Sequence, residues 1–526
     1  MRKAFLLFTI TSLSIIGMLS YVNWKFSFLL LIFIPLILMG LYDMYQCKKS
    51  IRRNFPLLGR MRYVLEALGP GARQYFIEND TEGKPFSRLQ RSLVYQRSKK
   101  ETDSMPFGTQ LDVYDIGYQW INHSIKAIPF SEVNSNPRVK IGSSQCDNPY
   151  YASLFNISAM SFGSLSKNAI IALNAGAKEG GFYHNTGEGG LSPYHLQGGD
   201  VVWNIGTGYF SCRTDDGKFS IDEFIKRATL DNVKMIEIKF SQGAKPGHGG
   251  ILPKEKVTDE IAAIRLVGKG HDIISPPTHS AFKTPLELMD FVKLLRQGSG
   301  GKPIGMKICI GNKSEFIAIC KAMVQSKTRL DFITVDGGEG GTGAAPQEYS
   351  DHVGMPLRDA LAFVYDCLVG FDLKKDIKII CSGKIISGFD ILKTLSTGAD
   401  LCNSARGMMF ALGCIQALEC HANTCPTGVA TQDPQLTKGL VPQEKSIRVA
   451  RFQHETVKSA MELMASAGID HPDKVDRSVV SMRVDRTKIQ TFEETYPELK
   501  VGSLLDGSTV PNEFFRHWKK ASAESF

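Results

Sequence analysis

The chain has 526 residues, 43% of them hydrophobic and 22% charged, so it can bury a sizeable core and is not an intrinsically disordered protein. Its 11 cysteines are too sparse for a disulfide-stapled scaffold. The net charge of +9 does not indicate a nucleic-acid-binding protein, because no basic stripe is interleaved with aromatic residues. Much of the excess charge follows an N-terminal apolar region, where it suits a membrane surface.

The first 47 residues predict a membrane anchor. Residues 4–22 and 26–42 are two uncharged apolar runs, each long enough to span a bilayer. Basic residues flank the pair on both sides, namely Arg2 and Lys3 before it and Lys48, Lys49, Arg52, Arg53, Arg60 and Arg62 after it. By the positive-inside rule both ends lie in the cytoplasm, and Lys25 between the runs is the one discordant charge.

A secretory signal peptide is the alternative interpretation of the first apolar run. It is disfavoured because no small-residue cleavage site precedes the second run. We therefore expect residues 1–47 to form two transmembrane helices in the cell membrane, with the rest of the chain on the cytoplasmic side. Residues 48–150 have a mixed composition with a helix expected over Met61–Leu68, and we interpret them as an N-terminal collar of the main domain.

From about residue 151, short β-type runs alternate with helical stretches. The expected strands are Leu154–Met160, Phe182–Asn185, Met235–Ser241, Asp272–Ser275, Ile304–Ile310, Phe332–Asp336, Ile377–Ser382 and Asp400–Ser404. The expected helices are Lys167–Gly176, Pro285–Arg296, Lys313–Gln325, Leu357–Val369 and Phe389–Thr397. Eight strands alternating with helices predict an α/β fold, a (β/α)8 TIM barrel over residues 151–437.

A doubly wound sheet is the alternative fold, and it is disfavoured because no G-x-G-x-x-G sequence opens a helix after a strand. The interval of roughly fifty residues between the second and third expected strands indicates an insertion. Residues 438–526 are expected to form a C-terminal helical extension, with a helix over Ser446–Ala467 that packs back on the barrel.

The residues that follow the expected strands are unusually polar and rich in glycine. In a TIM barrel these strand ends meet at one face and form the active site. Glycines after the seventh and eighth strands let backbone N–H groups approach a phosphate, and Arg406 could add a charged contact. Together with Lys307 inside the fifth strand, which would stabilise negative charge on a reduced flavin, this pattern indicates a flat, phosphorylated cofactor. Gln242 and Lys245 could hold an anionic substrate over the ring. A structural ion pair for Lys307, and a solvated loop for Gln242 and Lys245, are the alternatives.

Three of the cysteines fall close together, as Cys414-x5-Cys420-x4-Cys425 with Pro426 after the last. Three thiolates at this spacing suit an iron–sulfur cluster, and a 3Fe–4S cluster more than a four-iron one. Zinc with His421 as the fourth ligand is the competitor, although adjacent Cys420 and His421 would chelate one tetrahedral ion awkwardly. Buried reduced thiols are the third interpretation.

Six strings resemble the FMN and iron–sulfur domain of glutamate synthase, in the same order, over roughly residues 150–435. They are SAMSFGSLS, NTGEGG, KFSQGAKPGHGGILP, ISPPTH, GGTGAAP and ALGCIQALECHANTCPTGVATQ. The string RNFPLLGRMRYVLEALGPGARQYF resembles the shorter FMN-binding glutamate synthase family proteins and extends the likeness back to about residue 52.

The resemblance implies which residues form the site. FMN would lie against Ala159, Met160, Ser161, Asn185, Gln242, Lys307, Gly338, Gly383, Ala405 and Arg406. The implied catalytic residues are Lys245, Gln242 and Lys307, with 2-oxoglutarate bound near the first two, and Cys414, Cys420 and Cys425 would bind a 3Fe–4S cluster. The implied reaction is reductive amination of 2-oxoglutarate with ammonia to L-glutamate, in which reduced flavin delivers hydride to the imine carbon.

Three departures from the family pattern limit what the resemblance implies. No N-terminal glutaminase domain is visible, so ammonia would come from solution or a partner. No nicotinamide-binding segment is visible, so electrons would come from ferredoxin or a separate reductase. His248 stands where glutamate synthases usually have Glu, which leaves open another 2-oxo acid or amine, as in N-methylglutamate synthesis. A membrane-tethered scaffold or sensor is the non-enzyme alternative, against which the presence of Gln242, Lys245, Lys307 and the three cysteines argues.

Overall fold

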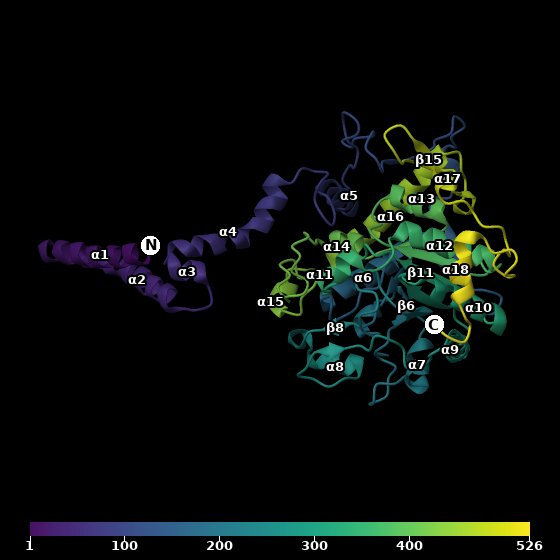
Figure 1. Ribbon diagram of the computed structural model, residues 1–526, viewed down its shortest axis with the longest axis horizontal. Helices are drawn as coiled ribbons and strands as arrows, with labels where there is room; N and C mark the ends of the chain where they lie inside the picture. Colours follow the sequence, from purple (N-terminus) through teal and green to yellow (C-terminus); the bar gives the residue numbers. More distant parts are fainter. The chain divides into compact units, whose positions relative to one another are not determined.

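The computed structural model describes residues 1–526, which form two units, Met1–Arg88 and Leu89–Phe526 (Figure 1). The helices of the first unit are α1 (Arg2–Val22), α2 (Leu30–Tyr45), α3 (Ser50–Asn54) and α4 (Leu58–Ala72), with a 3₁₀ turn over Trp24–Leu29 and a π-helical turn over Arg73–Ile77. The helix predicted over Met61–Leu68 lies inside α4.

Two helical segments of the first unit, Arg2–Val22 and Trp24–Tyr45, are long and apolar enough to cross a membrane. Near the end of the second segment, Asp43 is fully buried and accepts two hydrogen bonds from the Arg60 guanidinium, at 2.7 and 2.8 Å. A bidentate pair of this kind fixes orientation as well as distance. The chain after α2 therefore folds back onto the end of that helix.

Eight parallel strands close into a barrel in the second unit. In chain order they are β4 (Phe155–Ile157), β5 (Tyr183–Asn185), β6 (Asp200–Ile205), β7 (Val233–Lys239), β10 (Ile304–Ile308), β11 (Phe332–Asp336), β12 (Lys378–Ser382) and β13 (Leu401–Ser404). Nearly all of their residues are buried, as in a barrel whose interior is filled by side chains and whose outside is covered by helices. The closed barrel confirms the predicted fold class.

The insertion predicted between the second and third expected strands is wrong. That interval contains β6, which pairs with β5 on one side and β7 on the other. The fourth expected strand, Asp272–Ser275, instead contains the short β9 (Ile273–Ile274), which pairs with β8 (Ile251–Leu252) in a hairpin outside the barrel. A short apolar run marks a buried segment but does not specify the strand with which it pairs.

The helices that pack against barrel strands include α6 (Lys167–Gly180), α7 (Ile221–Ala228), α9 (Pro285–Gly298), α12 (Leu357–Gly370) and α13 (Gly388–Thr397), and α10 (Lys313–Ser326) packs against α9 and α12. The other helices of this region are α8 (Asp259–Arg265), α11 (Gln347–His352), α14 (Arg406–Leu412) and α15 (Pro434–Thr437). Ser166 caps α6 by accepting a hydrogen bond from Ala169 N, and Gly181 ends the helix with a φ of 66°, which glycine adopts without strain.

The long helix α16 (Pro442–Ser466) matches the helix predicted after the barrel and packs against α6 and α13. A Cβ added to Gly176 of α6 would lie 2.8 Å from Ser446 O, so the two helices approach closely only because this residue is glycine. Phe452 stacks edge-on against Phe155, with ring centroids 5.7 Å apart. The extension thereby supports the first strand of the barrel.

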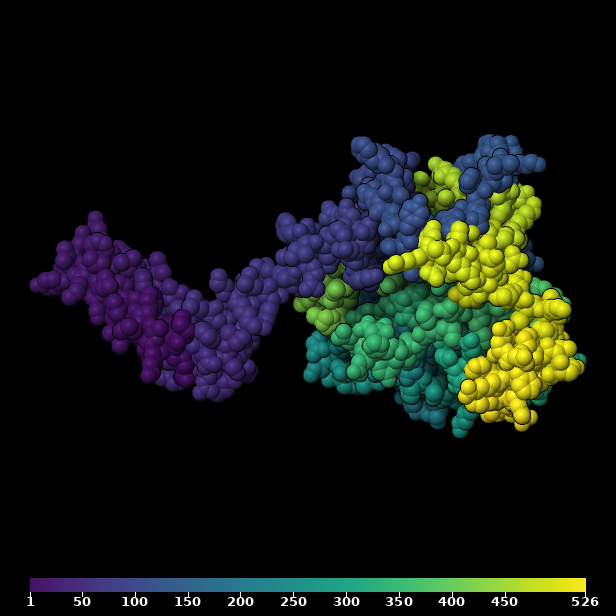
Figure 2. Space-filling view, turned by 45° about the horizontal axis from the view of Figure 1, so that its top comes forward, coloured from purple at the N-terminus to yellow at the C-terminus, as the bar shows by residue number.

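The segment before the barrel joins the C-terminal extension. Its elements are α5 (Arg88–Lys99), β1 (Gln119–Ile121), β2 (Arg138–Ile141) and β3 (Tyr150–Ser153), and the extension adds β14 (Val480–Arg483), β15 (Ile489–Thr491), α17 (Phe492–Thr495) and α18 (Asn512–Lys520). β1 pairs antiparallel with β14, which pairs with β15. Figure 2 shows the yellow C-terminal residues next to the blue residues that precede the barrel. These two parts of the chain therefore form one small sheet.

Candidate active site

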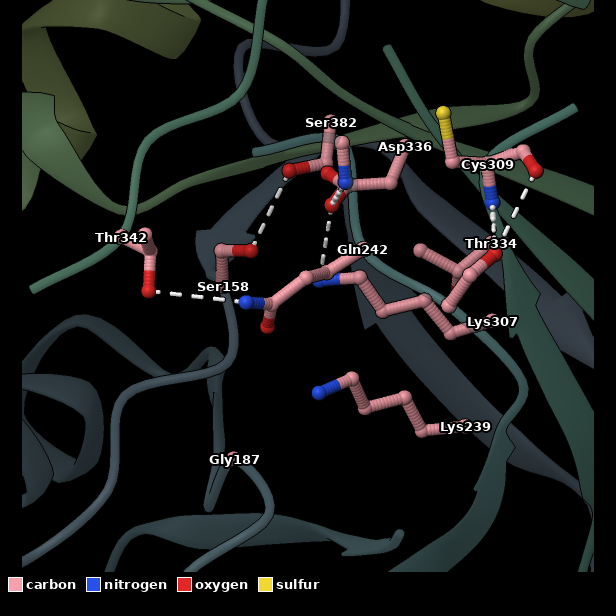
Figure 3. A network of polar contacts seen from close by, with 12 residues as sticks. Ser158, Gly187, Lys239, Gln242, Lys307, Cys309, Thr334, Asp336, Thr342 and Ser382 are labelled. Atoms are coloured by element: carbon pink, nitrogen blue, oxygen red, sulfur yellow. Dashed lines mark hydrogen bonds and ion pairs between the residues drawn. The ribbon is translucent and has the colours of Figure 1, made fainter. Parts of the chain in front are cut away.

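The loops that carry the polar sequence strings meet at the C-terminal ends of the barrel strands. All eight strands run parallel, so their C-terminal ends lie at one face. Ser158 follows β4 and Ser382 ends β12, and their Oγ atoms lie 3.2 Å apart at the barrel mouth (Figure 3). The structure therefore gathers the predicted site residues at one end of the barrel.

Lys307 lies on β10 and is buried, with its Nζ 3.4 Å from Asp336 Oδ2. The same carboxylate oxygen accepts a hydrogen bond from Gly243 N at 2.8 Å. Burial by itself would lower the pKa of Lys307, but the Asp336 and Glu237 carboxylates outweigh burial and raise that pKa. Lys307 is therefore a fixed cation in the barrel mouth. The ion pair expected as its alternative role is present.

Glu237 is fully buried on β7 and links three strands. It accepts hydrogen bonds from Asn185 Nδ2 (2.7 Å), Asn204 Nδ2 (2.6 Å) and Thr334 Oγ1 (2.6 Å). A buried carboxylate is tolerated when it is hydrogen-bonded and lies near a cation, and Lys307 provides that charge. Glu237 thus positions Asn185, one of the predicted cofactor-binding residues.

A second set of charged side chains lies around Glu188, which is in the loop after β5. Lys239 Nζ lies 2.5 Å from Glu188 Oε2, and the charges of Lys245 and Arg265 also act on this carboxylate. Burial would raise the pKa of Glu188, but the neighbouring cations, led by Lys239, lower it below its usual value. Three cations therefore face one carboxylate, which leaves this part of the site positively charged.

Two of these cations have N–H donors without a protein acceptor. Lys245 is 3% exposed, and its Nζ has neither a hydrogen bond nor an ion pair in the structure, while burial lowers its pKa. The Arg265 guanidinium lies over the Phe210 ring at 5.0 Å and donates to Phe162 O at 3.3 Å, but its Nε has no partner. Burial lowers the pKa of Arg265 to about 10. Both groups therefore carry buried N–H donors that no protein acceptor satisfies.

Lys239 and Lys307 are register partners on the adjacent strands β7 and β10. Figure 3 shows their side chains extending in the same direction, with Gln242 nearby and its Nε2 3.5 Å from Thr342 Oγ1. Cys309, two residues after Lys307, turns its thiol away from both lysines. The two ammonium groups consequently face the same space.

The other predicted cofactor-binding residues also lie at this end of the barrel. Ala159, Met160 and Ser161 follow β4, Gln242 follows β7, Gly338 follows β11, Gly383 follows β12, and Ala405 and Arg406 follow β13. A Cβ on Gly187 would lie 3.0 Å from Ser161 N, and one on Gly341 would lie 2.9 Å from Arg406 Nε. Glycine at these two positions lets the loops pack closely against Ser161 and Arg406, and the cations and glycine-rich backbone present at this end of the barrel fit a flat, anionic group.

The three cysteines of the predicted cluster lie in an irregular loop after α14. Gln416, Leu418 and Asn423 in this loop have φ values of 59°, 60° and 61°, a conformation that non-glycine residues adopt at a cost. Burial raises the pKa of Cys414 to about 12. This loop holds an unusual backbone shape in the absence of regular secondary structure.

Cys425 differs from the other two cysteines in its surroundings. It is buried, yet contacts with the Thr427 hydroxyl and with the backbone N–H groups of Ala430, Thr427 and Val429 lower its pKa. No three His, Cys, Asp or Glu side chains converge closely enough to hold a metal ion. Iron–sulfur clusters are nevertheless bound by thiolates of this kind, often with backbone N–H groups directed at the sulfur atoms. The three cysteines therefore match the ligands of such a cluster in residue type.

A cavity of about 40 Å³ joins the charged site to the cysteine loop. Its lining includes Glu188, Lys245, Lys256, Thr342, Cys420 and His421. The cysteine loop therefore borders the group of cations described above.

The sequence analysis assigned no individual role to five charged residues of this site. They are Glu188, Glu237, Lys239, Arg265 and Asp336. Glu188, Lys239 and Asp336 stand inside or beside the glycine-rich strings, and Glu237 is the only acid inside the apolar run of β7, so each had a detectable signal. Arg265 had none, because only the fold of α8 brings it to Glu188.

The chain is similar to several known proteins. Residues 116–470 match the family model described as the conserved region in glutamate synthase. The glutamate synthase large subunit-like protein YerD of Bacillus subtilis is 39% identical, over 84% of this chain and 92% of its own length. The archaeal glutamate synthase (NADPH) of Methanocaldococcus jannaschii is 35% identical over 66% of this chain, and the chain spans 63% of that relative. A solved mandelate oxidase mutant is similar with a TM-score of 0.42 at 13% identity, over 81% of this chain and 99% of its own.

Proposed function

Because the chain belongs to the glutamate synthase family of oxidoreductases, we propose that it is an FMN- and iron–sulfur-dependent enzyme that converts 2-oxoglutarate and ammonia to L-glutamate. The observation that carries this proposal is the excess of positive charge at the barrel mouth. Lys239, Lys245 and Arg265 face the single carboxylate of Glu188. 2-Oxoglutarate carries two carboxylates, so it would neutralise charge that a neutral substrate would leave uncompensated.

Lys245 and Gln242 are the residues that we assign to the substrate. Lys245 Nζ makes no hydrogen bond or ion pair although Glu188 acts on its charge, and the Gln242 amide holds only a long contact with Thr342. Arg265 offers a planar pair of N–H donors that matches a carboxylate. Glu188 separates the cations and keeps their mutual repulsion low while the site is empty of substrate.

FMN would be held by the loops that contain Ala159, Met160, Ser161, Asn185, Gln242, Lys307, Gly338, Gly383, Ala405 and Arg406. The chemistry that a bound flavin supplies is hydride transfer to carbon, here to the imine of 2-oxoglutarate. Lys307, kept protonated by Asp336 and Glu237, would balance the negative charge of the reduced cofactor, and Arg406 would contact its phosphate.

Cys414, Cys420 and Cys425 would bind a 3Fe–4S cluster, which supplies single electrons when present. The N–H donors around Cys425 and the left-handed residues of this loop support the assignment. The electron donor would be ferredoxin or a separate reductase subunit, and ammonia would come from solution or from a partner.

Residues 1–47 would anchor the enzyme in the cell membrane as two transmembrane helices, with the barrel on the cytoplasmic side. Two segments of sufficient length and apolarity, and the basic residues that follow them, support this location.

Rapid-mixing spectroscopy tests the proposed reaction. Purified protein is reduced with dithionite and mixed with 2-oxoglutarate plus ammonium, and the flavin absorbance is followed. Reoxidation should need both compounds together. A flavin that stays reduced in their presence would exclude glutamate synthesis by this chain.

His248 favours one alternative, a different 2-oxo acid or amine. It lies three residues after Lys245, with Nδ1 2.9 Å from Gly249 O and its ring edge-on to Tyr349 at 5.3 Å. Histidine in place of the usual glutamate removes a carboxylate from the proposed substrate loop, which changes the nitrogen compound or acid that fits beside it. Methylamine in place of ammonium, or pyruvate in place of 2-oxoglutarate, separates the alternatives in the same rapid-mixing experiment.

A further inference from the structure

Lys256 is a buried cation without a carboxylate partner. It ends the 3₁₀ turn Lys254–Lys256 and is 4% exposed. Its Nζ donates hydrogen bonds to Cys420 O at 2.7 Å and Ala430 O at 3.4 Å, and it forms no ion pair with Asp or Glu. Two carbonyl oxygens satisfy N–H groups but do not neutralise the charge.

The groups that face this ammonium belong to the cysteine loop. Cys420 and Cys425 are the charged or titratable side chains that act on it electrostatically. The cavity that Lys256 lines leads from Cys420 to Glu188 and Lys245. Lys256 thus stands between the proposed cluster and the proposed substrate site.

A buried ammonium is costly unless an anion lies near it. Neutral thiols provide no such charge, whereas thiolates bound to iron do, because metal binding releases their protons. The charge of Lys256 therefore matches a cysteine loop with a cluster bound better than an empty one.

We propose that Lys256 is a positioning residue of the cysteine loop, whose positive charge compensates the negative charge of cluster-bound thiolates and favours uptake of an electron by the cluster. The hydrogen bond to Cys420 O fixes the loop, and the charge stabilises the more negative, reduced state. This inference rests on the proposed iron–sulfur function.

The test compares four full-length proteins purified with iron and sulfide present during expression. They are the wild type, Lys256→Met, Lys256→Arg and Lys254→Met. Methionine has a similar length without the charge, arginine keeps the charge, and Lys254 is an exposed lysine of the same turn. Iron and acid-labile sulfide are measured in each protein, and the cluster midpoint potential is measured by redox titration with electron paramagnetic resonance.

The expected result is that Lys256→Met shifts the one-electron reduction equilibrium at least tenfold toward the oxidised cluster, a fall of about 59 mV in midpoint potential. Lys256→Arg should keep most of the wild-type value, and Lys254→Met all of it. Loss of the cluster in Lys256→Met with retention in Lys256→Arg would support the same role.

Two results would overturn the inference. One is a wild-type potential in an iron-loaded Lys256→Met protein, and the other is equal loss of iron in the methionine and arginine variants, since packing alone would then explain the effect. An iron-free wild type would refute the proposed cluster itself, and with it the role of Lys256. Wild-type iron content therefore separates a failure of the cluster assignment from a failure of the inference.

Discussion

Removing the charge of Lys307 separates its structural role from its functional one. In Lys307→Met, Asp336 keeps its hydrogen bond from Gly243 but loses the cation 3.4 Å away. At that distance the Coulomb attraction is about 5 kcal/mol for an effective dielectric constant of about 20. Leaving one partner of a buried pair alone typically costs about 3–5 kcal/mol. The single variant should therefore be less stable by about that amount.

The matched control is Lys307→Met combined with Asp336→Asn. The amide removes the unpaired charge at Asp336, so part of the lost stability should return, while the buried Glu237 still lacks the nearby cation that Lys307 provides. In a folding unit of this size, about 4 kcal/mol corresponds to a fall of about 4 °C in the thermal midpoint. The single variant should show this fall in thermal unfolding, and the double variant should recover part of it.

The midpoint potential of the flavin should depend on the charge at position 307 and not on the thermal stability of the variant. Both variants lack the cation that would balance reduced FMN, so both should have a two-electron flavin midpoint potential lower by about 30 mV or more, a change of about 1.4 kcal/mol. A double variant that regains both thermal stability and the wild-type flavin potential would refute the functional assignment and leave Lys307 as a structural ion pair alone.

Three further predictions test separate parts of the account. Cys420→Ser should abolish bound iron while FMN is retained, and unchanged iron content by colorimetric assay would refute its assignment as a ligand. Lys245 would bind the substrate anion only when protonated, and burial lowers its pKa. The KM for 2-oxoglutarate should therefore begin to rise at a lower pH than it would with an ordinary lysine. Lys245→Arg should remove this pH dependence over the same range, and an unchanged pH profile of KM would contradict the assignment. Cys47 is exposed just after the second apolar helix. A membrane-impermeant maleimide should therefore label it in inverted vesicles and not in intact spheroplasts, with Cys47→Ser as the control. The reverse pattern would place the barrel outside the cell.

The alternation of strands and helices was sufficient to predict the barrel, but not which strands compose it. Residues 200–205 fell in the long interval that was interpreted as an insertion, although all but the first of them are buried in β6. Conversely, Ile273 and Ile274 are apolar but pair with β8 outside the barrel. Strand pairing depends on contacts between distant segments, and a local hydrophobic pattern does not contain that information.

The place of the candidate site was predictable where chemistry coincides with a local signal, because glycines and polar residues after each strand pointed to the barrel mouth. The cluster indicated by the cysteine spacing stays a prediction. Arg265 and Lys256 were not predictable, because each is an ordinary surface-like residue in sequence and becomes buried only when the chain after β7 folds over the mouth. The pairing of β1 with β14 was hidden for the same reason, since its partners lie hundreds of residues apart.

Single-turnover isotope transfer tests the central claim most directly. Dithionite-reduced, full-length protein is mixed with 2-oxoglutarate and ¹⁵N-ammonium, quenched, and analysed by mass spectrometry for labelled glutamate. A glutamate synthase-type enzyme should form about one ¹⁵N-labelled L-glutamate per bound flavin, and oxidised protein should form none. Flavin-loaded, reduced protein that yields no labelled glutamate would contradict the account.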